Sequence, residues 1–254
     1  MSAITLYAHA TPGFADRLAA AAARLRAAAE EHAGRIVQAS SLGAEDMVVT
    51  DLLARHAPAV AVATLQTGML HAETWALVDR LEAKYGRRVE RVEPKQEATI
   101  AFVRNHGADA MYRSIELRKA CCGLRKTEPL ARLLAGRSAW ITGLRREQSA
   151  ARGGVAFAER DEAGRAKLNP IADWSWSDVW HYIERHAVPY NALHDAFFPS
   201  IGCAPCTRAV AAGEDFRAGR WWWEDESAKE CGLHVNAPSS SAATPAGSRS
   251  EATA

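Results

Sequence analysis

Short apolar runs alternate with longer helical stretches through the first half of the chain, and this alternation constrains the fold more than any other feature. The runs expected to be strands cover residues 35–40, 60–65, 88–94 and 138–143. Helical periodicity is found in the stretches 14–33, 44–57, 71–86 and 111–136. Alternation of this kind predicts an α/β protein, with a mostly parallel sheet flanked by helices.

Three polar, glycine-containing segments follow predicted strands. They read "SSLGAED" from residue 40, "LQTGML" from residue 65 and "TGLRREQS" from residue 142. Ligands of such sheets bind outside the carboxyl ends of the strands, so these segments are the expected site loops. "SSLGAED" opens a helix and could cradle a phosphate, but it matches neither Walker A nor G-x-G-x-x-G. Taken alone, an ordinary capped turn is the simpler interpretation.

The remaining chain and its composition narrow the class. A length of 254 residues allows a substantial core, and a net charge of +1 gives no global field that attracts nucleic acid. The N-terminus lacks the features of a secretory signal, and no apolar run reaches the ~18 residues that span a bilayer. We therefore expect a cytoplasmic protein without membrane or nucleic-acid partners. A tryptophan-rich helix is predicted over 175–187, one domain over 1–235 and a disordered tail over 236–254.

Four of the five cysteines form two pairs, Cys121–Cys122 and the C-x-x-C of Cys203 and Cys206. Adjacent Cα atoms are about 3.8 Å apart, which is below the usual disulfide range of ~4.4–6.8 Å. Structural zinc usually takes pairs with two to four intervening residues, whereas a cubane iron–sulfur cluster spreads four thiolates over four irons. The spacing favours the cluster over zinc. Buried, unligated thiols are the remaining alternative.

The fifth cysteine, Cys231, lies in "SAKECGLHV", close to a lysine and three residues before His234. Such a thiol is either reactive, with a low pKa, or an inert exposed cysteine, and spacing does not separate the two. If the other four cysteines hold a cofactor, the fifth is left for nucleophilic chemistry.

Basic residues gather near the cysteines and the strand ends. Any one of them is an ordinary surface charge, but together they indicate an anionic substrate, because arginine makes forked contacts with sulfate or phosphate. The set comprises Arg125, Lys126, Arg145, Arg146, Arg152, Arg208, Arg217 and Arg220. Three tryptophans, Trp221–Trp223, follow Arg220 directly. Their role is left open between core packing, stacking on an adenine and forming a clamp, because three consecutive residues of a regular element cannot all face inward.

Together, these motifs resemble the assimilatory adenylylsulfate (APS) reductases, the iron–sulfur branch of the phosphoadenylylsulfate reductase family. The resemblance runs from about residue 35 to 234 and rests on "SSLGAEDMV", "LQTGMLHAET", "CCGLRK", "TGLRREQS", "CAPCTRAV", "GRWWWE" and "KECGLH". It implies an adenine-nucleotide α-hydrolase-like, Rossmann-like fold with a mobile C-terminal segment that carries the nucleophile.

The resemblance also implies residue roles. One [4Fe–4S] cluster would be held by Cys121, Cys122, Cys203 and Cys206. Cys231 would be the nucleophile, with Lys126 linking cluster and substrate, and His234 near the sulfate. The substrate-binding residues would be Ser40, Ser41, Gly43, Leu65, Gly68, Gly143, Arg145, Arg146, Arg152, Arg217 and Arg220.

The implied reaction reduces APS to sulfite and AMP through a Cys231 S-sulfonate. A thioredoxin-like or glutaredoxin-like dithiol would then release sulfite. A homo-oligomer is a possible assembly. Two departures from the family pattern touch the nucleotide rim: Gln66 stands where aspartate is common, and "HAET" where "FPET" is common.

Three alternatives remain at this point. A phosphoadenylylsulfate (PAPS) reductase, or an enzyme that accepts both nucleotides, shares most of the motifs. A tRNA-thiolation ATP pyrophosphatase shares the fold but should carry "SGGxDS", which "SSLGAED" does not match. A non-catalytic zinc-binding module would leave Cys231 without a role.

Overall fold

A computed structural model describes residues 1–225 of the protein. Cys231, His234 and the predicted tail at 236–254 lie outside the described residues, and so does the predicted domain boundary at 235. Those expectations stay predictions. Among the described residues, no helix combines the length and the apolar character needed to cross a lipid bilayer.

Six strands form one sheet in the order β3-β2-β1-β4-β6-β5. All neighbouring pairs are parallel except β5–β6, which is antiparallel. The strands are β1 (Ile36–Ser40), β2 (Ala61–Leu65), β3 (Val89–Val92), β4 (Ala139–Ile141), β5 (Ala158–Arg160) and β6 (Ala166–Leu168). The four predicted strands and the mostly parallel sheet are confirmed. The short β5–β6 pair was not predicted.

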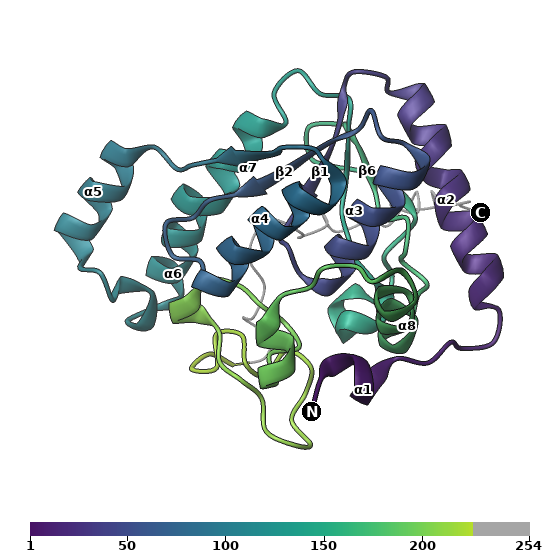
Figure 1. Ribbon diagram of the computed structural model, residues 1–254. Helices are drawn as coiled ribbons and strands as arrows, with labels where there is room; N and C mark the ends of the chain where they lie inside the picture. Colours follow the sequence, from purple (N-terminus) through teal and green to yellow (C-terminus); the bar gives the residue numbers. More distant parts are fainter. Residues whose placement is uncertain (226–254) are drawn as a thin grey trace, which may run out of the picture.

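Helices cover both faces of this sheet (Figure 1). The larger core joins one face to α1 (Ala3–Tyr7), α2 (Phe14–Glu31), α3 (Ala44–His56), α4 (Ala72–Tyr85) and α8 (Trp176–His186). A smaller core, with Val37, Trp140 and Leu133 among its members, joins the other face to α7 (Glu128–Leu133). The β1 strand is buried on both faces, as expected for a central parallel strand.

Helix boundaries follow local capping chemistry. The predicted tryptophan-rich helix is confirmed as α8, where Ser175 and Asp178 form a reciprocal capping box. The stretch 111–136, predicted as one helix, is divided into several elements. It begins with a short 3₁₀ turn, Ala110–Tyr112, and Ser114 then caps the helix α6 (Ile115–Cys122). A π-helical turn, Gly123–Thr127, then leads into α7.

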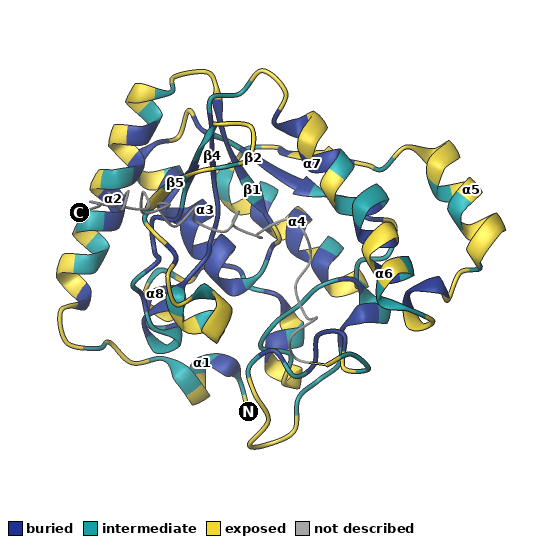
Figure 2. Ribbon diagram, turned by 180° about the vertical axis from the view of Figure 1, so that it is seen from behind, coloured by how far each residue is buried: buried dark blue, intermediate teal, exposed yellow. Residues whose placement is uncertain are grey.

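The short helix α1 and the helix α5 (Gln96–His106) were not predicted, and α5 has no buried residue. It stands away from the sheet, and its surface is mostly exposed (Figures 1 and 2). Helix prediction from sequence relies on an apolar stripe that faces a core, and α5 has no such buried face.

Candidate active site and four-cysteine centre

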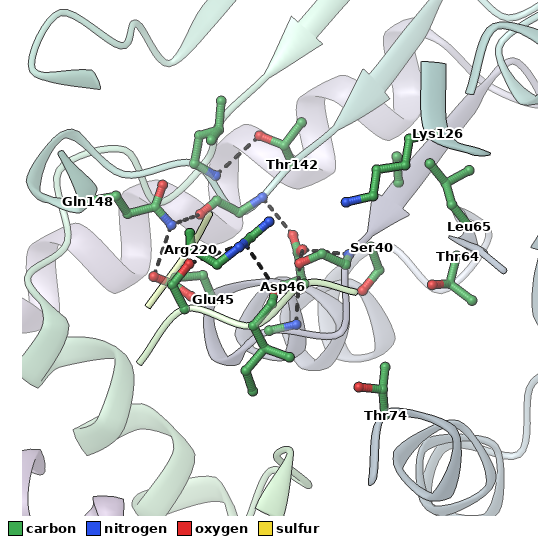
Figure 3. A pocket seen from close by; sticks show the side chains of 18 of the residues that line it. Ser40, Glu45, Asp46, Thr64, Leu65, Thr74, Lys126, Thr142, Gln148 and Arg220 are labelled. Carbon is green, nitrogen blue, oxygen red and sulfur yellow. Dashed lines mark hydrogen bonds between the residues drawn. The ribbon is translucent and has the colours of Figure 1, made fainter. Parts of the chain in front are cut away.

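A pocket opens at the carboxyl ends of β1, β2 and β4, where the sequence placed the site loops. We call the part of it formed by residues 40–46 and 142–148 the loop wall. The part formed by Lys126 and residues 199–221 is the cysteine-side wall, because it reaches the cysteines. Figure 3 shows Glu45 and Gln148 on one side of this pocket, and Lys126 with Leu65 on the other.

Asp46 organises the loop wall. One carboxylate oxygen accepts hydrogen bonds from the Ser41 backbone N–H (2.7 Å) and hydroxyl (2.6 Å). The other accepts from the Gly143 N–H at 2.8 Å, so Asp46 joins the loop after β1 to the loop after β4. Burial raises the pKa of Asp46 to about 6, against the opposing effect of its hydrogen bonds. Sequence reasoning missed Asp46, although an acidic residue in the first helical turn was the available signal.

Gly143 fits this junction because it has no side chain. A Cβ atom there would lie 2.7 Å from an Asp46 carboxylate oxygen and 2.8 Å from the Asp46 backbone nitrogen. Only glycine allows the two loops to approach this closely. The turn after β1 is also unusual, since Leu42 has a φ of 62° and is buried, with its N–H donating to the Ser40 hydroxyl.

Arg145 lies behind the loop wall in ion pairs. Its guanidinium donates to Glu45 at 2.9 Å and to Glu147 at 2.9 Å, and it is almost fully buried. Although burial disfavours the charged form of Glu45, the Arg145 charge and the Gln148 amide hold the pKa of that carboxyl below its ordinary value. This buried pair attaches the loop after β4 to the first turn of α3, a positioning role that one sequence cannot show.

Nine of the residues predicted to bind substrate or to link substrate and cluster line the pocket: Ser40, Ser41, Gly43, Leu65, Lys126, Gly143, Arg152, Arg217 and Arg220. Three predicted residues do not: Gly68, Arg145 and Arg146. Arg146 donates to the Val155 carbonyl and lies over the Phe157 ring. The Gly68 N–H donates to the side-chain oxygen of Gln66, so Gln66 closes the local turn that an aspartate would close.

The four paired cysteines come together. All are free and buried, and they line one small cavity together with Arg125 and Lys126. The C-x-x-C loop is held against the loop after β2, because the Ala204 N–H donates to the Met69 carbonyl and Leu70 forms a β-bridge with Cys203. From the other side, the Tyr112 hydroxyl donates to the Pro205 carbonyl at 2.6 Å. The fold thus brings together two cysteine pairs that are separated by 80 residues in the sequence.

The surroundings shift the pKa values of two of these thiols in opposite directions. Burial, with Cys203 as a neighbour, raises the pKa of Cys206 to about 12. Burial acts in the same direction on Cys203, but Lys126, the Thr67 hydroxyl and Arg220 together hold its pKa below the ordinary value. Cys203 is therefore the thiol that the cysteine-side wall most favours as a thiolate, the form that binds metals.

Four gathered thiols are a donor set that an iron–sulfur cluster could use. Within residues 1–225, no three histidine, cysteine or acidic side chains are placed to hold one metal ion. Four thiols around a single cavity are the ligand set of a cubane, in which each thiolate binds a different iron. No disulfide joins them.

The pocket and the cysteine cavity share a boundary. Lys126 and Cys203 line both, so a ligand in the pocket and a cofactor between the cysteines would have the same two neighbours. Arg220 is held close to this boundary, since its guanidinium donates to the Ser200 hydroxyl and the Ile201 carbonyl. Gly202 permits that placement, because a Cβ there would lie 2.5 Å from the Arg220 guanidinium.

Two buried donors on the cysteine-side wall are unsatisfied. Neither Arg220 Nε nor Trp221 Nε1 has a hydrogen-bond partner within the part of the chain that the structure describes. Buried donors without acceptors are costly, and an anionic ligand supplies acceptors. This wall thus has the chemistry of an anion site.

The three consecutive tryptophans take different environments. Trp221 is 1% exposed and lines the pocket, whereas Trp222 is 39% exposed. Trp223 packs against the Tyr112 ring, with the centroids 4.5 Å apart. Of the readings that the sequence left open, packing thus accounts for Trp223. Packing also accounts for Trp221, which belongs to the buried cluster around the cysteines and borders the pocket.

A parallel sheet with a pocket at its carboxyl edge is the arrangement in which open α/β proteins bind their ligands, and it defines the class of this protein. The family comparison makes this specific: residues 35–209 match the phosphoadenosine phosphosulfate reductase domain, and the chain belongs to that family. The predicted resemblance is confirmed. The tRNA-thiolation proteins and a non-catalytic zinc module are thereby set aside.

Two relatives are similar over most of their length. The chain is 54% identical over 200 residues to the adenosine 5'-phosphosulfate reductase of Allochromatium vinosum, covering 78% of each protein. It is 49% identical over 226 residues to the enzyme of the same name from Burkholderia cepacia, covering 89% of this chain and 90% of the relative.

A solved structure supports the fold. The phosphoadenylyl-sulfate (PAPS) reductase of Candida auris superimposes with a TM-score of 0.63 at 26% identity, covering 74% of this chain and 90% of that one. The predicted adenine-nucleotide α-hydrolase-like fold is confirmed by this likeness.

Proposed function

We propose that the protein reduces adenylylsulfate to sulfite and AMP in assimilatory sulfate reduction. The observation that carries this proposal is the shared boundary of Lys126 and Cys203 between an anion pocket and four gathered thiols. The relatives of about 50% identity that are named adenosine 5'-phosphosulfate reductase support APS as the substrate. The family match supports an enzyme that acts on a sulfonated adenine nucleotide.

The first half-reaction forms a covalent intermediate. The Cys231 thiolate attacks the sulfur of the sulfuryl group, the sulfur–oxygen bond to the phosphate breaks, and AMP leaves with that electron pair. Cys231 then carries an S-sulfonate. Nucleophile and substrate are both anionic, so the cations of the cysteine-side wall, Lys126, Arg217 and Arg220, would reduce their repulsion. His234 is proposed to contribute a further positive or donor group near the sulfate.

The second half-reaction consumes a dithiol. A thioredoxin-like or glutaredoxin-like partner attacks the Cys231 sulfur and expels sulfite, giving a mixed disulfide. The partner's second thiol resolves that disulfide, which regenerates Cys231 and leaves the partner oxidised by two electrons. No further electron donor is needed.

Cys121, Cys122, Cys203 and Cys206 would hold one [4Fe–4S] cluster. When bound, it would cross-link α6 to the C-x-x-C loop and place charge beside Lys126. Within the protein itself, Lys126 and Arg220 act on the Cys203 thiol and on the pocket at once. A cytoplasmic location and a homo-oligomeric assembly stay predictions, as do the single domain over 1–235 and the tail.

The experiment compares sulfite release from APS and from PAPS by anaerobically purified protein, with dithiol reductant and measured iron. We expect about four irons per chain, as a cubane requires, and turnover of APS. Cys231→Ser should keep the iron and release no sulfite. A preference for PAPS would overturn the substrate assignment and keep the mechanism. Normal sulfite release by an iron-replete Cys231→Ser variant would overturn the mechanism.

A further inference from the structure

The side-chain amide of Gln148 has hydrogen-bond partners at both ends. Its nitrogen donates to a Glu45 carboxylate oxygen at 2.9 Å. Its oxygen accepts from the Arg145 backbone N–H at 3.1 Å and from a terminal nitrogen of Arg152 at 2.8 Å. Because a carboxylate only accepts and these N–H groups only donate, the partners fix which end of the amide carries the oxygen. Gln148 lines the pocket, yet the reaction proposed above assigns it no part.

Arg152, the cation that this oxygen contacts, also lines the pocket. It ends a short 3₁₀ turn, Ala150–Arg152, in which no residue is buried. Such a turn gives a long side chain little support of its own, and holding an arginine in one orientation costs side-chain entropy. A fixed acceptor therefore helps to set the direction of the guanidinium, and the Gln148 oxygen is such an acceptor.

The other end of the amide is attached to a rigid part of the pocket. Glu45 lies in the first turn of α3, and its carboxylate also accepts from the almost fully buried Arg145 guanidinium at 2.9 Å. Gln148 thus joins this ion pair on one side to a pocket cation on the other. Arg152 is thereby oriented relative to the loop after β1, which lines the same pocket.

The neutrality of Gln148 matters as much as its hydrogen bonds. A carboxylate at this position would accept from Arg152 equally well, but it would also offset the positive charge that attracts an anion. The amide oxygen orients the guanidinium without that effect. Glu45, the carboxylate that holds the amide, is itself paired with Arg145.

We propose that Gln148 is a positioning residue that orients the Arg152 guanidinium toward the anionic end of the substrate. The inference rests on the proposed function, which makes the substrate a phosphosulfate nucleotide. Gln148 acts through Arg152 and needs no contact with the substrate. Its effect on substrate binding therefore exists only while Arg152 is present.

The test is a double-mutant cycle of Gln148→Met and Arg152→Met in the full, iron-loaded chain. A Cys231→Ser background blocks sulfonation, so the dissociation constant of APS is measured at equilibrium, under anaerobic conditions. Methionine keeps an unbranched side chain and removes the hydrogen-bonding groups. We expect each single change to weaken APS binding about tenfold, as for loss of a contact to a charged group. The double variant should bind APS about as weakly as Arg152→Met alone.

Two further variants separate orientation from general loosening of the loop. Gln148→Glu keeps the size and the acceptor but offsets the charge of Arg152. It should weaken APS binding and reduce the dependence of that binding on ionic strength, as Arg152→Met does. Gln96→Met makes the same substitution at an exposed residue of α5 and should bind APS like the parent. Iron content and Tm are measured for every variant.

The outcomes distinguish the two proposals. If the iron-loaded Cys231→Ser parent binds no APS, the proposed function fails and the positioning role fails with it. If the parent binds APS and the two methionine effects add in the double variant, Gln148 acts independently of Arg152, and only the positioning role is wrong. The positioning role is also wrong if Gln148→Met binds APS as tightly as Gln96→Met, or if Gln148→Glu keeps the parent's dependence on ionic strength.

Discussion

The two walls of the pocket contain similar polar residues but differ in how the hydrogen-bonding groups of those residues are used. On the loop wall, the carboxylates of Glu45 and Asp46 accept the hydrogen bonds of Arg145, Ser41 and Gly143, so its charges and donors are used internally. On the cysteine-side wall, Arg220 Nε and Trp221 Nε1 have no hydrogen-bond partner among the described residues. The hydrogen bonds of the loop wall fix its conformation, whereas the cysteine-side wall has donors that a ligand could use.

This difference separates residues that look alike in the sequence. Arg145 and Arg220 both lie in basic motifs, yet Arg145 has a buried carboxylate partner and Arg220 faces the pocket. Substitutions on the loop wall should therefore act through stability and geometry. Those on the cysteine-side wall should act through the cofactor and the anion.

The largest expected effect is on the cysteine-side wall. Cys203→Ser removes the thiol that borders both cavities, and a serine hydroxyl does not replace a thiolate ligand. We expect loss of most of the iron and a fall in APS turnover of about 100-fold or more, since even outer-shell changes cost 10–100-fold. Iron analysis and the visible spectrum give the measurement. Cys231→Ser serves as control and should keep its iron; full iron in Cys203→Ser would refute the ligand assignment.

The next effect tests whether the loop wall works through geometry. Gly143→Ala places a Cβ against the Asp46 backbone and carboxylate, and overpacking of this kind costs about 1–3 kcal/mol. Tm should fall by about 2–4 °C for each kcal/mol, with APS turnover reduced. Gly154→Ala is the matched control, because its added Cβ meets nothing within 4 Å. Equal melting temperatures for the two variants would contradict the close-approach argument.

A pH-dependent effect follows from Asp46. Its pKa is raised by burial to about 6, so between about pH 4 and pH 6 the folded protein binds more protons than the unfolded chain. Stability from this group is therefore greatest at the acid end and falls as pH rises through about 6, by roughly 3 kcal/mol at most. Asp46→Asn should abolish that slope in anaerobic urea unfolding. Asp79→Asn, an exposed change, should retain the wild-type slope; a wild-type slope in Asp46→Asn would show that another group is responsible.

The smallest effect concerns the support of the C-x-x-C loop. Tyr112→Phe removes the hydrogen bond to the Pro205 carbonyl, which should cost about 0.5–1.5 kcal/mol and speed the loss of iron to a chelator. Tyr190→Phe removes a hydroxyl that contacts Asp195, away from the cysteines. That variant should lose iron at the wild-type rate. Identical chelation rates for the two variants would mean that Tyr112 does not hold the loop.

The sequence predicted the parts of the fold with strong periodicity. The strands β1 to β4 and the helices α2, α3, α4 and α8 were found from apolar runs and amphipathic spacing. The helix α5 was missed because it has no buried face, and α1 because five residues are too few for a periodic pattern. The strands β5 and β6 were missed because they lack the apolar run that revealed the equally short β4.

The candidate site was predictable where chemistry is local in sequence. Paired cysteines, strand-end loops and clustered arginines are visible as motifs, and the structure gathers most of them around one pocket. The partners of Arg145 and Arg118 were not visible, since Glu45 and Glu224 lie about a hundred residues away in the chain. A single sequence does not show which charged side chains form ion pairs in the folded protein. Residues whose role is to position others were therefore not predicted.

The most direct test of the account is to mix APS with iron-replete protein in the absence of any dithiol and to follow the sulfuryl group. We expect release of one AMP per chain and an S-sulfonate confined to Cys231, which a thioredoxin-like dithiol then discharges as sulfite. Release of sulfite without that intermediate, or a sulfonate on another cysteine, would contradict it.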